Sequence, residues 1–197
     1  MTTINISSLF TRYINLPEYK NRSQSMINLL EFHGITNYER VDGISNDIEK
    51  AHRNAVSCKG PLLVLEDDCV PIHYLPTIDV PDDADLLFLG ACPYNFLGNR
   101  ISENLWKIDY MISTTAVVYL TDKAKNIILN QPLSPYKPID EYLATKLCEI
   151  VAYGVNAPFW YQYDVPEVTA TALSNSPTKP PYHGGGYPDY PMPLTFK

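Results

Sequence analysis

The chain has 197 residues, which is enough for one sizeable hydrophobic core and short for two. Its formal net charge is −7 and its 15 Lys and Arg residues are scattered, so the basic stripe of a nucleic-acid-binding protein is missing. There is no run of eighteen apolar residues and no signal-peptide pattern at the N-terminus, which argues against a membrane-spanning segment. We therefore expect a cytoplasmic protein, in the host cytoplasm if the source is a virus, with nucleic acid an improbable partner.

Short apolar segments alternate with amphipathic ones along the chain. In order, we expect a strand at 13–16, a helix at 21–33, a strand at 38–41, a helix at 46–58, strands at 61–65, 86–90 and 115–120, helices beginning near 121 and 140, and a strand at 151–157. Caps are expected at Asn21 with Gln24, at Asn46 with Glu49, and at Thr121. The alternation predicts one α/β domain over residues 1–163, with a central, mainly parallel sheet flanked by helices.

The composition changes from Asp164 onward. Residues 164–197 hold 7 of the 17 prolines and the run Gly184-Gly185-Gly186. Such a segment cannot continue a helix or a central strand. We expect an irregular tail that packs on the domain or extends from it.

Three acids, Glu66, Asp67 and Asp68, follow the fully apolar segment 61–65. The carboxyl ends of strands in open parallel sheets are where ligands bind. Like charges a few ångströms apart cost on the order of 1–4 kcal/mol per pair, and a bound Mg²⁺ or Mn²⁺ would remove that cost. The other interpretation is a solvated acidic turn without a ligand.

Six short segments of the sequence, taken together and in this order, form a recognisable pattern. They are Ile14-Asn15-Leu16 with Arg22, Tyr38-Glu39-Arg40-Val41-Asp42-Gly43, Leu63-Val64-Leu65-Glu66-Asp67-Asp68, Leu86-Leu87-Phe88-Leu89-Gly90, Thr114-Thr115-Ala116-Val117-Val118-Tyr119-Leu120 with Ala124, and Pro138-Ile139-Asp140-Glu141-Tyr142-Leu143. This ordered set resembles the family 25 glycosyltransferases, the lipooligosaccharide galactosyltransferase group, and implies a GT-A-like fold. The chain departs from the family near the second helix, where Ala51-His52-Arg53 stands in place of a Ser-His pair.

The resemblance implies a transferase that moves a hexose, with galactose favoured, from a UDP-sugar to a glycan with inversion. It places Mn²⁺ or Mg²⁺ on Asp68, Glu66 and His183, and His183 is otherwise expected to be an exposed histidine of the tail. It assigns the nucleotide sugar to Asn15, Leu16, Arg22, Glu66 and Asp67.

The general base implied by the resemblance is Asp140 or Glu141, and Asp140 would otherwise be a helix cap. Tyr94, Asn95 and Trp106 either line the acceptor pocket or pack in the core. His52 is expected to pack in the core or lie at the surface. Three other functions remain open: a non-catalytic nucleotide-sugar or glycan-binding module, a glycosyltransferase acting on protein or modified nucleic acid, and an interaction protein that acts through its Pro/Tyr-rich tail.

Overall fold

The computed structural model describes residues 1–44, 47–71, 76–90, 96–132, 138–155 and 160–162. The strands are β1 (Thr2–Asn5), β2 (Phe10–Asn15), β3 (Tyr38–Asp42), β4 (Leu62–Glu66), β5 (Cys69–Pro71), β6 (Thr77–Val80), β7 (Leu86–Phe88), β8 (Phe96–Arg100), β9 (Leu105–Met111), β10 (Ala116–Tyr119), β11 (Ala152–Val155) and β12 (Trp160–Gln162). The helices are α1 (Lys20–Phe32), α2 (Ile48–Val56), α3 (Asp122–Leu129) and α4 (Ile139–Lys146), with short 3₁₀ turns at Ile6–Ser8 and Leu147–Glu149.

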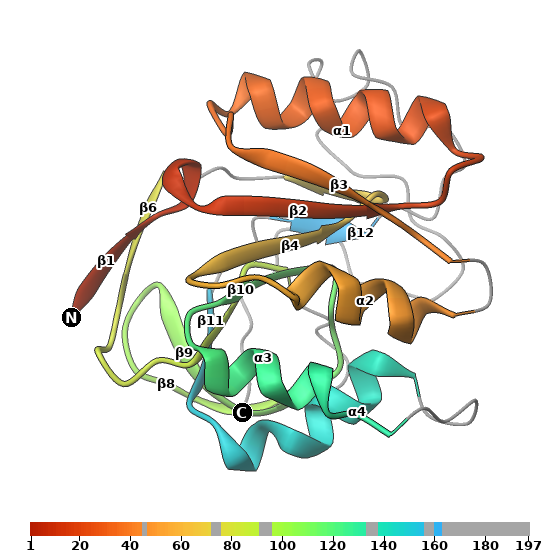
Figure 1. The fold of residues 1–197 in the computed structure, drawn as a ribbon. Helices are drawn as coiled ribbons and strands as arrows, with labels where there is room; N and C mark the ends of the chain where they lie inside the picture. The colour runs from red at the N-terminus through yellow and green to blue at the C-terminus, as the bar shows by residue number, and fades with distance from the viewer. Residues whose placement is uncertain (45–46, 72–75, 91–95, 133–137, 156–159, 163–197) are drawn as a thin grey trace, which may run out of the picture.

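An eight-stranded sheet in the order β3-β2-β4-β10-β7-β11-β9-β8 forms the centre of the described structure (Figure 1). Strands β3, β2 and β4 are mutually parallel, and so are β7 and β11. Strand β10 runs antiparallel to both its neighbours, and β9 does the same between β11 and β8. Six strands therefore run one way and two the other, so the α/β prediction is confirmed and the mainly parallel sheet is a mixed one.

Helix α1 covers one face of the sheet, while α2, α3 and α4 cover the other (Figure 1). Residues 62–65 of strand β4 are all apolar because both faces of the strand are buried. Its side chains alternate between the two faces, with Leu62 and Val64 in the core beneath α2 and Leu63 and Leu65 in the core beneath α1. The same alternation sends the next two residues, at the carboxyl end of this strand, to opposite faces.

The helix ends test the predicted caps. Helix α1 stops before Gly34, whose φ of 70° suits a glycine, and Thr121 caps α3 by accepting the Ala124 N–H, as predicted. The cap predicted at Asn21 with Gln24 is wrong, because α1 already begins at Lys20 and has Tyr19 at its N-cap, two residues earlier, without a side-chain cap bond.

Helix α2 is capped by Asp47, whose carboxylate accepts the Lys50 N–H at 3.0 Å. The cap predicted at Asn46 lies outside the described residues, as does the expected tail over 164–197. No helix in the described part of the chain is long and apolar enough to cross a membrane.

The sequence did not predict β8 and β9, which form one edge of the sheet. Strand β9 does alternate, since Trp106 and Ile108 are buried while Lys107 and Asp109 are exposed. Trp106 thus belongs to the core and is only 7% exposed, which favours core packing over the acceptor-pocket alternative. Strands β1 and β6 form a separate two-stranded sheet, also not predicted.

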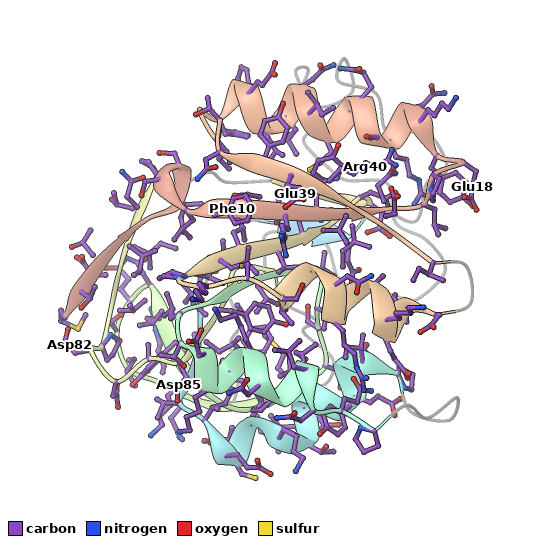
Figure 2. The ribbon with its side chains drawn as sticks, in the orientation of Figure 1. Phe10, Glu18, Glu39, Arg40, Asp82 and Asp85 are labelled. Carbon is purple, nitrogen blue, oxygen red and sulfur yellow. The ribbon has the colours of Figure 1, made fainter. Side chains whose placement is uncertain are left out.

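A buried carboxylate joins three elements at the start of β7. Asp85 accepts hydrogen bonds from the Thr121 hydroxyl at 2.7 Å, the Val151 N–H at 3.0 Å and the Lys123 ammonium at 3.2 Å. Figure 2 shows Asp85 beside the start of α3. Burial opposes its ionisation, but these three donors outweigh burial, and the pKa of Asp85 is lowered.

Replacing Asp85 with alanine is expected to lower the free energy of unfolding by about 2–4 kcal/mol, because a buried backbone donor and a helix cap lose their acceptor. The pKa of Asp85 is lower in the folded protein than in the unfolded chain. The stabilisation by its carboxylate is therefore complete above about pH 4 and is lost as the pH falls through the pKa of the folded state. Urea unfolding between pH 2 and 7 measures it, with Asp109→Ala on the exposed side of β9 as the control. A loss that is equal at pH 2 and pH 7 would contradict this account.

Candidate functional site

The candidate site lies where the neighbouring parallel strands β2 and β4 end. Ile14 pairs with Glu66 in the register of these strands, so Asn15 comes to lie beside Asp67. Asp67 and Asp68 form the turn that leads from β4 to β5, and we call residues 66–68 the acidic turn. Strand β4 also borders antiparallel β10, so the acidic turn stands where the sheet changes its strand direction.

Asp67 faces α1 and is held by two donors. The Asn15 amide donates to its Oδ2 at 2.6 Å, and the Arg22 guanidinium contacts its Oδ1 at 3.3 Å. The same Asn15 amide also donates to the Tyr19 carbonyl at 3.1 Å. Burial raises the pKa of Asp67; Asn15 and Arg22 lower it and the charge of Glu66 raises it, and the net shift is upward.

Asn15 is completely buried, which defines what it does in this structure. Both of its contacts are acceptors, so its Nδ2 must face them and its orientation is fixed. Its Oδ1 is buried and has no hydrogen-bond partner among the described residues. Asn15 therefore positions Asp67, and the base contact suggested by the sequence would require its side chain to become exposed.

Glu66 faces α2, on the opposite side of the sheet from Asp67. Its Oε1 lies 3.2 Å from His52 Nε2 and accepts the Thr114 hydroxyl at 2.8 Å. Burial opposes ionisation of Glu66, but the bonds from His52 and Thr114 and the charge interaction with His52 outweigh it, and the pKa of Glu66 is lowered. His52 is fully buried, so this contact anchors the acidic turn to the middle of α2.

Leu16 follows β2 directly and packs against the segment after β3. The Gly43 N–H donates to the Asn15 carbonyl at 2.8 Å. A Cβ at Gly43 would lie 3.1 Å from the Leu16 backbone nitrogen, so only glycine allows this close approach without a shift of the chain. Gly43 thereby fixes the backbone that carries Asn15.

The two candidate bases lie in the first turn of α4. The Asp140 carboxylate accepts the Glu141 N–H at 2.8 Å, which is a local cap, and Glu141 is exposed. Helix α4 begins on the side of the molecule toward which β2 and β4 run (Figure 1). The described bonds of Glu66 and Asp67 run to other residues than Asp140 and Glu141.

Other candidates cannot be placed. His183, Tyr94 and Asn95 lie outside the described residues. The described residues contain no group of three or more His, Cys, Asp or Glu side chains arranged to hold a metal. Mg²⁺ is commonly held by one or two carboxylates together with substrate phosphates, so a metal here would depend on the phosphates of a bound nucleotide.

The structure also changes the argument for a metal. Asn15 and Arg22 stabilise the charge of Asp67, and His52 and Thr114 stabilise that of Glu66. The protein itself therefore offsets part of the negative charge of Glu66 and Asp67, although the net pKa shift of Asp67 is still upward.

Sequence reasoning missed His52 and Thr114 as members of the site. His52 is buried, as the expectation of core packing allows, but its Nε2 also lies 3.2 Å from Glu66 Oε1, a contact that the sequence does not predict. The available signal was its place at the centre of an amphipathic helix that precedes the acidic strand. Thr114 is 48 residues from Glu66 and carried no such signal.

Comparison with known proteins bears on the fold. No family model matches the chain, and no curated protein matches it. Thirteen chains of solved structures match, among them the inositol-1-phosphate CTP transferase from T. maritima, with a TM-score of 0.52 and 11% identity over 85% of this chain and 94% of that chain. The resemblance to family 25 glycosyltransferases stays a prediction, and what the comparison establishes is that this chain shares the α/β fold of a transferase that uses a nucleotide.

Proposed function

We propose that this protein is a nucleotide-dependent transferase that moves a hexose, with galactose favoured, from a nucleotide sugar to a glycan hydroxyl. The observation that carries the proposal is the assembly of Asn15, Arg22 and Asp67 at the carboxyl ends of two neighbouring parallel strands. Ligand sites in open α/β sheets lie at this edge, where side chains leave the packed core. The fold shared with a CTP transferase supports a nucleotide as the donor.

In this proposal, Asp68 and Glu66 hold Mn²⁺ or Mg²⁺ together with the donor diphosphate. Both described bonds to Glu66 end on Oε1, which leaves Oε2 for the cation. Both oxygens of Asp67 are engaged by Asn15 and Arg22, so Asp67 orients the turn and does not act as a ligand. Bound there, the cation would stabilise the negative charge that develops on the departing nucleoside diphosphate.

The acceptor hydroxyl must lose a proton, and Asp140 or Glu141 is proposed to take it. Asp140→Asn keeps the cap acceptor for the Glu141 N–H and removes the base. If Asp140 is the base, this variant is expected to lose about 10²–10⁴-fold in turnover with unchanged stability and donor affinity. Glu141→Gln is the matched exchange at the exposed neighbour, and full turnover in both variants would contradict the assignment.

A second function is favoured by the fold comparison, namely transfer of a nucleotidyl group to a sugar phosphate, since the structural neighbour is a CTP transferase. The two reactions release different products. Glycosyl transfer from a nucleotide sugar releases a nucleoside diphosphate, whereas nucleotidyl transfer from a nucleoside triphosphate releases pyrophosphate.

One assay separates these functions. The protein is incubated with Mn²⁺ and either nucleotide sugars with saccharide acceptors or nucleoside triphosphates with sugar 1-phosphates, and both products are quantified. We expect nucleoside diphosphate release that depends on the acceptor. Pyrophosphate release alone would replace the proposal with nucleotidyl transfer. Donor binding without either product would indicate a binding module, and no binding of any nucleotide would contradict all three.

A further inference from the structure

An exposed aromatic ring stands beside the acidic turn, at the point where β2 passes into α1. Tyr19 is 42% exposed, although it occupies the N-cap position of α1. The Arg22 guanidinium lies over its ring, 4.8 Å from the centroid. An aromatic ring that is both exposed and held in place loses little freedom when a flat ligand stacks on it.

Tyr19 is also connected to the acidic turn, through the side chains of Asn15 and Arg22. The Asn15 amide bridges the Tyr19 carbonyl and the Asp67 carboxylate, at 3.1 and 2.6 Å. Arg22 joins the same two residues, since it contacts Asp67 and covers the Tyr19 ring. The Tyr19 ring and the acidic turn are therefore linked through Arg22, and the Tyr19 backbone through Asn15. A ligand that places its phosphates at the turn meets this ring with its remaining part.

The charged groups around the Tyr19 ring bear on which part of a nucleotide can lie against it. The residue before Tyr19 is Glu18, which is exposed where β2 passes into α1, as Figure 2 shows. This carboxylate and the Arg22 guanidinium over the ring are opposite in sign, so the surroundings of the ring do not favour a charged group over a neutral one. A flat, neutral group is the chemistry that suits an exposed aromatic ring in this environment.

We propose that Tyr19 is the platform on which the nucleobase of the donor stacks, while its diphosphate lies at the acidic turn. This inference rests on the proposed function, because it assumes that a nucleotide binds at this edge of the sheet. Stacking of a base on an aromatic side chain is sequence-tolerant, so the platform accepts uracil and cytosine alike. Discrimination between bases then falls to hydrogen-bonding groups around the ring.

The test compares ligands with and without a base. Binding of UDP, CDP and pyrophosphate is measured calorimetrically in the presence of Mn²⁺, for the wild type and for Tyr19→Ala, Tyr19→Phe and Phe32→Ala. Phe32 is 80% exposed at the other end of the same helix and is the matched control. We expect Tyr19→Ala to weaken UDP and CDP by about 10-fold or more and to leave pyrophosphate unchanged. Tyr19→Phe and Phe32→Ala are expected to bind like the wild type.

A spectroscopic variant keeps the test valid if Tyr19→Ala folds poorly. In Tyr19→Trp, UDP is expected to quench the added fluorescence, and pyrophosphate is not. Unchanged UDP affinity in Tyr19→Ala, or an equal loss for UDP and pyrophosphate, would overturn the platform while leaving nucleotide binding intact. Failure of the wild type to bind either nucleotide would instead overturn the proposed function, and the platform with it.

Discussion

Replacing Asn15 with aspartate is expected to lower the free energy of unfolding at pH 7 by about 3–5 kcal/mol. The new carboxylate would stand, completely buried, against the Asp67 carboxylate and the Tyr19 carbonyl, both of which now accept from the Asn15 amide. The amide donor would be replaced by an acceptor that faces two other acceptors. The new negative charge would be buried without a compensating partner. The substitution changes the shape of the side chain hardly at all, so the effect isolates the hydrogen bonds.

The stability of the Asn15→Asp variant is expected to depend on pH. Burial beside Asp67 raises the pKa of the new carboxyl in the folded state above its unfolded value. The folded variant then binds more protons than the unfolded one, so its stability falls as the pH rises above about 4. Urea unfolding should show a deficit that is small at pH 4 and largest at pH 7. Asn104→Asp, in an exposed turn, is the control and should change stability by less than about 0.5 kcal/mol. A deficit that shrinks toward pH 7 would exclude the arrangement around Asp67.

Replacing Asp68 with asparagine is expected to reduce transfer by about 10²–10³-fold or more, if the proposed cation site is correct. Asparagine keeps the size of the side chain and removes the charge that would bind Mn²⁺. Stabilisation of the protein by UDP should then lose its dependence on Mn²⁺, whereas the wild type should gain about 2.7 kcal/mol at a hundred times the dissociation constant.

Thermal unfolding with UDP, with and without Mn²⁺, measures this effect independently of turnover. Chelation of the wild type should reproduce the variant. Asp109→Asn, which removes an exposed carboxylate on β9, should behave as the wild type. If Asp68→Asn retained full Mn²⁺-dependent stabilisation, the cation would have to be placed elsewhere.

Much of the fold follows from the sequence because the central strands are apolar on both faces. Residues 62–65 of β4 and all of its neighbour β10 are buried, and the sequence predicts both strands. The direction of β10 was not predictable, because a strand with two buried faces reads the same in a parallel or an antiparallel sheet. Strand β9 was missed although its residues alternate, since Lys107 and Asp109 interrupt the apolar pattern.

For the candidate site as well, the sequence predicts some of the residues and misses others. Asn15, Arg22 and Asp67 were singled out from the sequence, and the parallel register of β2 and β4 explains why two of them touch. The part played by His52 depends on the rotation of α2 against the sheet, and that of Thr114 on a strand far along the chain. Neither is encoded in local spacing, because both are set by tertiary packing.

The sequence positions of the site residues have a consequence for how such a protein can diversify. Asn15, Tyr19, Arg22, His52 and the acidic turn all lie within the first 68 of 197 residues, in the part that builds β2, α1, β3, α2 and β4. Among the described contacts of these residues, that of Thr114 with Glu66 comes from outside this segment. Under the proposed function, the donor side would thus be encoded mainly in one contiguous stretch of sequence, and substitutions after residue 68, Thr114 excepted, could change the acceptor side without altering it.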